Sequence, residues 1–357
     1  MIRSLPLVLA LACLGAQARA DDSQRPVHDE EVEVGLDIQR AIESGHAFLV
    51  RNQDEHSGAF DSNSEYKLAI TAFSCLSLMA GGHLPGRGAY GQNVERGLRF
   101  LLDSQSKGGL FWRADDKSRM HGHGYATLAV AEAYGMVESP AFRARLKASL
   151  KTAVFRIEQS QTKEGGWGYE AEAVIHEGSV TVIQLQALRA AKDAGIAVSI
   201  ETIEKAREYL RLSANPDGSF KYRLDHAGSH NSFPLTAAGV ASLQAKGDYA
   251  AEEVDRGLGY MIQYLPPADR LMVGEDQYYV QFYHYGQFYA AQAMYHAVDR
   301  NYWKRWYPAI AEQLMSPGYY SFRQKCWTNS RFGDVFATAI STIVLQIPYK
   351  YLPIFQR

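Results

Sequence analysis

The chain has 357 residues, of which 46% are hydrophobic, 21% are charged and 12% are aromatic. This composition is typical of a packed globular protein and excludes an intrinsically disordered one. The formal net charge of -2 argues against a dedicated nucleic-acid-binding protein, which would carry a basic excess. A total of 3 cysteines excludes a disulfide scaffold and a multi-cysteine metal site.

The first 20 residues are typical of a secretory signal peptide. Arg3 precedes an uncharged, mostly apolar run, and the segment ends Ala18-Arg19-Ala20, with small residues where signal peptidase requires them. A lipoprotein signal centred on Cys13 is an alternative. We therefore expect an exported protein, periplasmic or secreted, that has no transmembrane anchor once the signal is removed. We expect its segments to be a signal peptide at 1–20, a flexible lead-in at 21–33 and a single domain at 34–357.

The remainder of the chain is an internal repeat. Five similar segments are separated by 52, 56, 53 and 51 residues, and they begin at Gly45, Gly97, Ala153, Ala206 and Gly257. A glycine turn follows each of the first four, and another occurs two periods later; these turns contain Gly58, Gly108, Gly165, Gly218 and Gly318. Counted this way, six units fit between residue 34 and the C-terminus.

Each unit contains two different helices. The first is amphipathic, with apolar residues at helical spacing, as at Leu146, Leu150, Ala153, Val154 and Ile157. The second is apolar on nearly every side, as over 68–80, 125–134, 180–191, 235–243 and 335–347. Because a helix that is apolar all round must be enclosed by others, the pattern predicts an all-α fold, an (α/α)6 toroid of six helical hairpins. An open solenoid is the main alternative, although solenoids usually repeat every ~33 to 47 residues.

One turn carries a family resemblance. Gln161 closes an outer helix and is followed by Gly165-Gly-Trp-Gly168. This pattern resembles the QW repeat of the squalene cyclases and protein prenyltransferase β subunits, and the resemblance covers essentially the whole chain after the signal. It implies a terpenoid cyclase-like toroid, in which the glutamine amide bonds exposed N–H groups of a neighbouring helix and the indole covers the turn. A toroid does not by itself imply an activity.

The catalytic motifs of that family are absent from the sequence. Squalene-type cyclases use an Asp-x-Asp-Asp acid, and the nearest segment here is Asp115-Asp116. The Asp-x-Cys zinc pair of the prenyltransferases and the Asp-Asp-x-x-Asp diphosphate motif are also missing. The resemblance therefore carries no established activity to this chain.

We expect the inner helices to begin around one mouth of a central cavity, where their dipoles favour anions. Polar residues that precede or open these helices are the candidate site. The catalytic candidates are His121, His123, His176, Glu177, His230 and Asp334, and the binding candidates are Tyr125, Tyr279, Tyr283, His284 and Arg331. The alternative is that the histidines are helix-start residues inherited with the repeat, and that the tyrosines pack at a helix–helix contact.

No cofactor is predicted. His121 and His123 supply two imidazoles for a metal ion, but residues two apart on a helix point to different faces, so the two would converge only within a loop. The two cysteines that follow the signal, Cys75 and Cys326, either pair or remain buried free thiols.

Three functions stay open, and the sequence does not decide whether the protein is an enzyme. The first is a protein that binds a ligand or partner at its cavity without catalysis. The second is a cyclase- or transferase-like enzyme acting on a small apolar molecule, which predicts an open aromatic cavity with one buried acid. The third is an (α/α)6 carbohydrate lyase or hydrolase, which for hydrolysis predicts two facing carboxylates ~5 to 10 Å apart. A plugged ring would favour the first.

Overall fold

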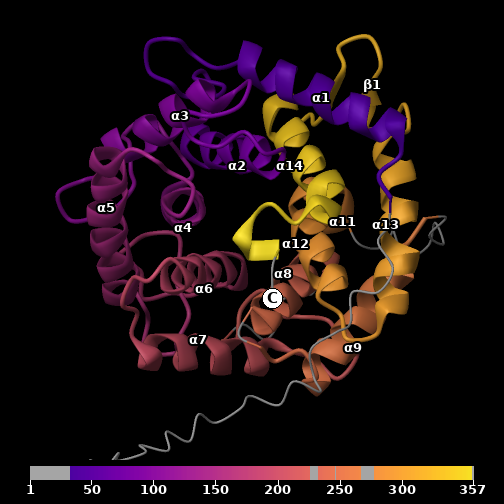
Figure 1. The fold of residues 1–357 in the computed structure, drawn as a ribbon. Helices are drawn as coiled ribbons and strands as arrows, with labels where there is room; N and C mark the ends of the chain where they lie inside the picture. The colour runs from indigo at the N-terminus through magenta and orange to yellow at the C-terminus, as the bar shows by residue number, and fades with distance from the viewer. Residues whose placement is uncertain (1–32, 226–231, 246, 267–276, 356–357) are drawn as a thin grey trace, which may run out of the picture.

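The computed structural model describes residues 33–225, 232–245, 247–266 and 277–355. Within them the chain forms six helical hairpins arranged in a ring (Figure 1). The outer helices are α1 (Leu36–Arg51), α3 (Gly91–Asp103), α5 (Pro140–Gln159), α7 (Ile200–Ser213), α9 (Glu252–Met261) and α13 (Arg300–Leu314). The inner helices are α2 (Lys67–Ala80), α4 (Arg119–Tyr134), α6 (Gly178–Asp193), α8 (Phe233–Gln244), α12 (Tyr283–Tyr295) and α14 (Asp334–Gln346). The predicted all-α toroid is confirmed.

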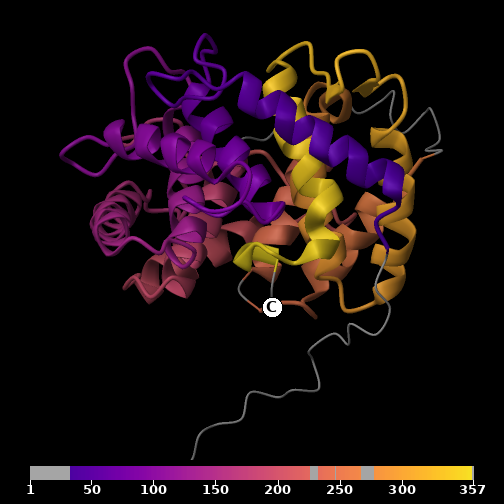
Figure 2. The same cartoon turned by 45° about the horizontal axis from the view of Figure 1, so that its top comes forward.

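In the tilted view of Figure 2, the indigo α1 lies beside the yellow α14. Short elements lie between and after the main helices. They are η2 (Ile262–Tyr264), α11 (Gln277–Gln281), the antiparallel pair β1 (Tyr320–Ser321) and β2 (Cys326–Trp327), η3 (Ile347–Tyr349) and η4 (Pro353–Phe355). Cys75 and Cys326 are both buried free thiols, which settles the question that the sequence left open. None of the helices in the described part of the chain has the length and hydrophobicity that a membrane span requires.

The two kinds of helix differ in burial as their sequences predict. In the outer helix α3, Val94, Leu98 and Leu101 are fully buried, whereas Arg99 on the other face is exposed to solvent. In the inner helix α2, every residue over 70–80 is buried. Each inner helix contacts the next one around the ring, so an apolar surface on every side is what its position requires.

The first and last hairpins close the ring. The hydroxyl groups of Ser77 on α2 and Thr342 on α14 are 2.6 Å apart, and Gln346 Nε2 donates to the Ser77 carbonyl at 3.2 Å. These contacts join segments more than 260 residues apart in the chain. The open solenoid is therefore excluded.

Glutamines at the ends of three outer helices join each hairpin to the next. Each Nε2 donates to two backbone carbonyls at 2.8–3.1 Å, and the donors and their acceptors are Gln53 with Gly58 and Asn93, Gln105 with Gly109 and Ser149, and Gln161 with Gly165 and Thr202. The expectation that these amides bind helix N–H groups is wrong, because on the neighbouring helices each Nε2 donates to a backbone carbonyl, that of Asn93, Ser149 or Thr202.

The turn glycines permit close packing against the next outer helix. Gly165 has a φ of +90°, and a Cβ at this position would lie 2.3 Å from the Lys205 carbonyl oxygen. A residue with a side chain would be strained in this backbone conformation. Its Cβ would also displace the neighbouring helix. The same arrangement recurs at Gly58, Gly109 and Gly218.

A second contact recurs in five of the turns. The backbone N–H of the turn aromatic donates, at 3.0–3.1 Å, to a side chain on the inner helix of the same hairpin. The pairs are Phe60 with Thr71, Phe111 with His123, Trp167 with Thr181, Phe220 with Thr236 and Trp327 with Thr338. Four of the acceptors are threonine hydroxyls and one is an imidazole, so His123 occupies a structural position of the repeat.

The segment after α14 crosses the end of the ring at which the inner helices finish (Figure 1). It is held by Glu132 near the C-terminal end of α4, whose Oε2 accepts the Ile354 N–H at 3.1 Å. The Glu132 side chain is buried, and burial raises the pKa of its carboxyl to about 8. This end of the ring is therefore covered, and the opposite end is the one that can admit a ligand.

Candidate functional site

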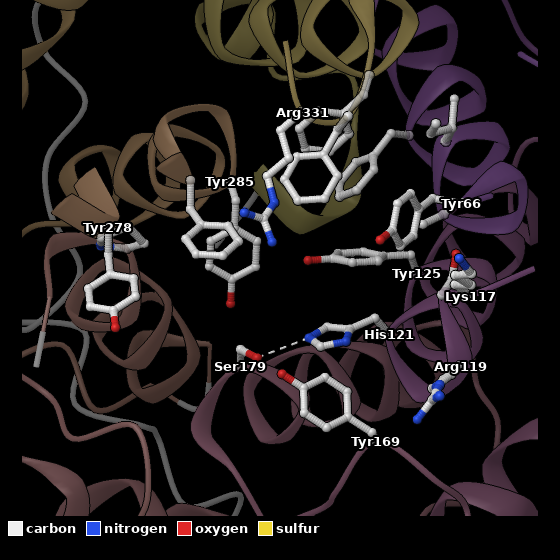
Figure 3. A pocket seen from close by; sticks show the side chains of 18 of the residues that line it. Tyr66, Lys117, Arg119, His121, Tyr125, Tyr169, Ser179, Tyr278, Tyr285 and Arg331 are labelled. Atoms are coloured by element: carbon white, nitrogen blue, oxygen red, sulfur yellow. Dashed lines mark hydrogen bonds between the residues drawn. The ribbon is translucent and has the colours of Figure 1, made fainter. Parts of the chain in front are cut away.

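A cavity of about 640 Å³ opens at the end of the ring where the inner helices begin (Figure 3). Each inner helix supplies residues from its first turns or from just before it, which confirms the predicted position of the cavity. Aromatic and aliphatic side chains form most of the lining, and they are Tyr66, Ala69, Ile70, Phe73, Tyr125, Tyr169, Tyr222, Pro234, Leu235, Tyr278, Phe282, Tyr285, Phe332 and Phe336. A cavity of this size and character suits a small, largely apolar ligand.

Packed aromatic rings form the floor of the cavity. The Phe73 ring lies 4.3 Å from Tyr125, 5.2 Å from Phe288 and 5.8 Å from Phe336, measured between ring centroids. The Tyr125 hydroxyl is 3.2 Å from that of Tyr289, below the lining. The predicted ligand contact Tyr125 thus faces the cavity with its ring while its hydroxyl has a protein partner.

A buried carboxyl stands behind one wall. Glu177 is the N-cap residue of α6, and its Oε1 accepts the Val180 N–H at 3.1 Å. Ser179 Oγ lies 2.8 and 2.9 Å from the two carboxyl oxygens, and the Tyr222 hydroxyl also bonds this carboxyl. Ser179 and Tyr222 both line the cavity, so the carboxyl reaches it through two hydroxyl groups.

Burial sets the protonation state of this group. The Glu177 side chain is only 3% exposed, and this burial raises its pKa to about 7, although the hydrogen bonds it accepts act in the opposite direction. Near neutral pH the carboxyl is therefore divided between its acid and its carboxylate form. A group with this property can both donate and accept a proton, as general acid–base catalysis requires.

His121 completes the polar wall. Its Nε2 lies 3.0 Å from Ser179 Oγ, and the side chain lines the cavity (Figure 3). Burial lowers the pKa of the imidazole to about 4, so the ring is neutral at pH 7. When Glu177 is ionised, the single Ser179 proton points to the carboxylate, and the neutral His121 then donates from Nε2 to Ser179.

Three cationic side chains line the mouth. Lys117 pairs with Glu65, and Arg119 pairs with Glu170 at 2.6 Å. Arg331 instead lies against aromatic rings of the lining. The lining residues that the structure describes include no Asp or Glu, and two of the three cations are paired with carboxylates that lie outside the lining.

The structure separates the other histidine candidates from the cavity. His123 is fully buried, with Nδ1 accepting the Phe111 N–H, and burial lowers its pKa to about 3. His176 is buried with Nδ1 3.0 Å from the Tyr209 hydroxyl. Neither imidazole lies in the lining, and His121 and His123 have different partners, the Ser179 hydroxyl and the Phe111 N–H. His230 lies outside the described residues.

The position of His123 in the repeat makes a prediction about stability. His123→Ala leaves the buried Phe111 N–H without its acceptor, which should cost about 1–3 kcal/mol of unfolding free energy. His123→Thr restores the acceptor found in the other turns and should recover much of that loss. Urea unfolding of the two variants measures the difference. Equal stability of His123→Ala and the wild type would contradict this assignment.

Of the remaining predicted site residues, one lines the cavity and four do not. Arg331 lines the cavity, whereas Asp334, Tyr279, Tyr283 and His284 do not. Asp334 accepts the Asn329 N–H at 3.2 Å and His284 Nδ1 lies 3.1 Å from Asn329 Nδ2, so both hold one loop. Tyr279 packs on Phe233, and the Tyr283 hydroxyl donates to Gln313 at 2.6 Å. The packing alternative describes these two tyrosines correctly, because their rings lie between helices.

The adjacent pair Asp115-Asp116 is structural. Asp116 accepts the N–H groups of Leu68 and Ser118 at 2.8 and 2.7 Å, and it thereby caps α2. Asp115 forms ion pairs with Lys67 and Arg113, each at 3.0 Å. Neither carboxyl lines the cavity, so the segment nearest to the cyclase acid motif does not supply its acid.

The sequence did not identify Ser179, Tyr169 or Tyr222 as site residues. The hydroxyl groups of Tyr169 and Tyr222 are 2.8 Å apart, next to Glu177. Each tyrosine follows the turn aromatic of its own unit by two residues, as Tyr169 follows Trp167. Aligning the repeats at that aromatic would have placed the two tyrosines at equivalent positions of neighbouring turns, facing the same mouth.

Comparison with solved structures finds other toroids. The α-1,6-mannanase GH76A of Salegentibacter sp. HEL1_6, in complex with α-1,6-mannotriose, has a TM-score of 0.65 and 10% identity, over 87% of this chain and 99% of that one. The type II terpene cyclase MstE from Scytonema has a TM-score of 0.55 and 15% identity, over 88% of this chain and 98% of that one. At such low identity these likenesses show the α/α toroid fold alone.

One curated relative is similar in sequence. The drimenyl diphosphate synthase of Streptomyces showdoensis is 27% identical over 184 residues, which make up 52% of this chain and 32% of the synthase. The match thus spans about a third of the synthase's length. No protein-family model matches the chain.

Proposed function

We propose that the protein is an enzyme that binds a small apolar molecule in this cavity and moves a proton to or from it through Glu177, as a cyclase or isomerase does. One observation carries the proposal: a buried carboxyl with a pKa near 7 is bonded to two hydroxyls of a cavity whose lining is mostly aromatic and aliphatic. Of the arrangements that the sequence left open, this one corresponds to the open cavity with a single buried acid.

The proposed chemistry uses the polar wall at Glu177 and the aromatic floor of the cavity. In its acid form, Glu177 donates to Ser179, and the Ser179 hydroxyl passes its own proton to a carbon–carbon double bond of the ligand. The positive charge that forms lies among the rings of Phe73, Tyr125 and Phe336, whose faces attract cations. Rearrangement and loss of a proton to the Glu177 carboxylate regenerate the acid, so that the proton balance closes and no co-reactant is consumed.

The comparisons support an isoprenoid-like ligand. MstE is named as a terpene cyclase and the curated relative as a diphosphate synthase of the drimenyl skeleton. Glu177 lies outside any Asp-x-Asp-Asp motif, so its chemistry here is inferred from its contacts and not transferred from those proteins. A glycoside hydrolase would need two facing carboxylates, and the described residues of the lining include none.

We further propose that the chain is a divergent QW-repeat protein and that it is exported after removal of residues 1–20. The glutamine contacts at Gln53, Gln105 and Gln161 support the first statement. The sequence of Met1–Ala20 supports the second. N-terminal sequencing of the protein from its native compartment tests export, because the mature chain should begin at Asp21.

Ligand binding and turnover test the proposal together. Farnesol and α-1,6-mannotriose are titrated against the protein by calorimetry, and isoprenoid products are sought by gas chromatography with mass spectrometry. We expect farnesol to bind and mannotriose not to bind. Ala69→Trp, which fills the cavity, should weaken farnesol binding about tenfold or more, whereas Ala144→Trp on the exposed face of α5 should not.

The outcomes separate the three functions. Farnesol binding that Ala69→Trp abolishes, together with an isomerised or cyclised product, supports the enzyme. The same binding with no conversion of any isoprenoid tested leaves a binding protein and contradicts the catalytic part. Binding of mannotriose in preference to farnesol contradicts the apolar ligand.

A further inference from the structure

We propose that Arg331 recognises a single carboxylate on the ligand, so that the substrate is a monoanionic amphiphile: an apolar chain that ends in one acidic headgroup. This inference rests on the proposed function and adds to it the headgroup, the residue that selects it and the orientation of the ligand.

Arg331 is held over the cavity by the residues around it. Its guanidinium carbon lies 5.0 Å from the centroid of the Phe282 ring and 5.3 Å from that of Phe332, and both rings belong to the lining. The Asn329 side chain accepts the Arg331 and Phe332 N–H groups at 2.9 and 2.7 Å, which fixes this loop. Figure 3 shows the guanidinium reaching into the cavity.

The charges around the mouth leave this guanidinium without a carboxylate. The other two cations of the lining, Lys117 and Arg119, are paired with Glu65 and Glu170. In the described part of the chain, Arg331 has no such ion pair. Arg331 is exposed at the mouth of the cavity, and its planar guanidinium can bind a ligand carboxylate through two parallel hydrogen bonds.

The charge of the site favours a carboxylate over a diphosphate. A diphosphate carries at least two negative charges and is usually bound with a metal ion or several cations. The described residues contain no group of three or more His, Cys, Asp or Glu side chains placed to hold a metal ion. With Lys117 and Arg119 already neutralised, one cation is matched by one negative charge.

The position of Arg331 also orients the ligand. Arg331 reaches in from one side of the cavity, and His121 with Ser179 lies on the facing side (Figure 3). A carboxylate on Arg331 therefore directs the apolar chain over the floor near Tyr125 toward the Glu177 wall. Proton transfer then occurs at a carbon remote from the headgroup, and Arg331 acts as a binding residue that sets specificity.

Three probes with the same apolar chain test the headgroup: farnesoic acid, farnesol and farnesyl diphosphate. Dissociation constants are measured by calorimetry for the wild type, Arg331→Gln, Arg331→Lys and the control Arg323→Gln, whose side chain lies in the exposed β1–β2 turn. We expect the wild type to bind the acid about tenfold or more tightly than the alcohol. Arg331→Gln should remove that preference and leave alcohol binding unchanged, Arg331→Lys should keep part of it, and Arg323→Gln should keep all of it.

Each other result is decisive. If the wild type binds the acid and the alcohol equally, the proposed carboxylate headgroup is wrong, while the proposed function stands. An equal loss of acid and alcohol binding in Arg331→Gln shows that Arg331 only shapes the wall. If the diphosphate binds more tightly than the acid and this binding depends on Arg331, the proposal that the headgroup carries a single negative charge is wrong. If none of the three probes binds, the proposed function itself fails and this inference falls with it.

Discussion

Replacing Glu177 by glutamine is expected to lower the rate of product formation by ~10²–10⁴-fold, the contribution typical of a general acid or base. Glutamine keeps an oxygen to accept the Val180 N–H and the Ser179 hydroxyl, so the α6 cap and the wall should survive. What it cannot do is release and recover a proton. Turnover measured beside the melting temperature separates loss of chemistry from loss of fold.

The pH profile supplies an independent measurement of the same group. Burial raises the Glu177 pKa to about 7, and the proposed reaction begins from the acid form. kcat/KM should therefore be level below this pH and fall about tenfold per unit above it. The control is Asp334→Asn, which keeps the acceptor for the Asn329 N–H and lies outside the cavity lining, so its turnover should change little. An unchanged rate in Glu177→Gln would place the acid elsewhere.

The fold was predictable because burial repeats along the chain. An outer helix such as α3 has one apolar face, whereas an inner helix such as α2 is buried on nearly every side. A closed ring encloses the inner helices and leaves one face of each outer helix in solvent. The direction of the glutamine contacts was not predictable, because an amide carries both a donor and an acceptor.

The site was predictable in location but only partly in its residues. His121 and His123 stand two positions apart at the start of one helix, and the sequence alone does not show which of them faces the cavity. The hydrogen bond that recurs in the turns decides it, because His123 accepts the N–H of the turn aromatic where other repeats have a threonine, and His121 does not. Arg331 and Glu177 were identified because they adjoin inner helices, whereas Ser179 contributes through a hydroxyl with no distinctive sequence signal.

Glu132 gives the largest expected effect on stability. Its carboxyl is buried beneath the C-terminal segment, and burial raises its pKa from about 4.5 to about 8. A carboxyl whose pKa is higher in the folded state favours folding while it is protonated in both states, and its contribution is lost as the pH rises from the unfolded value to the folded one. Between pH 5 and pH 8 this single group should therefore reduce the unfolding free energy by about 3 kcal/mol.

Glu132→Gln isolates this effect, because glutamine keeps the oxygen that accepts the Ile354 N–H and has no charge to bury. The variant should differ little from the wild type at pH 5 and should be more stable than it at pH 8 by a few kcal/mol. Arg189 and Asp193 also act on this carboxyl, in opposite directions, so both charges stay in place in the experiment. Urea unfolding at the two pH values measures the difference. A variant that is less stable than the wild type at both would show that Glu132 is ionised and paired in the folded protein, and the C-terminal segment would then depend on its charge rather than on its hydrogen bond.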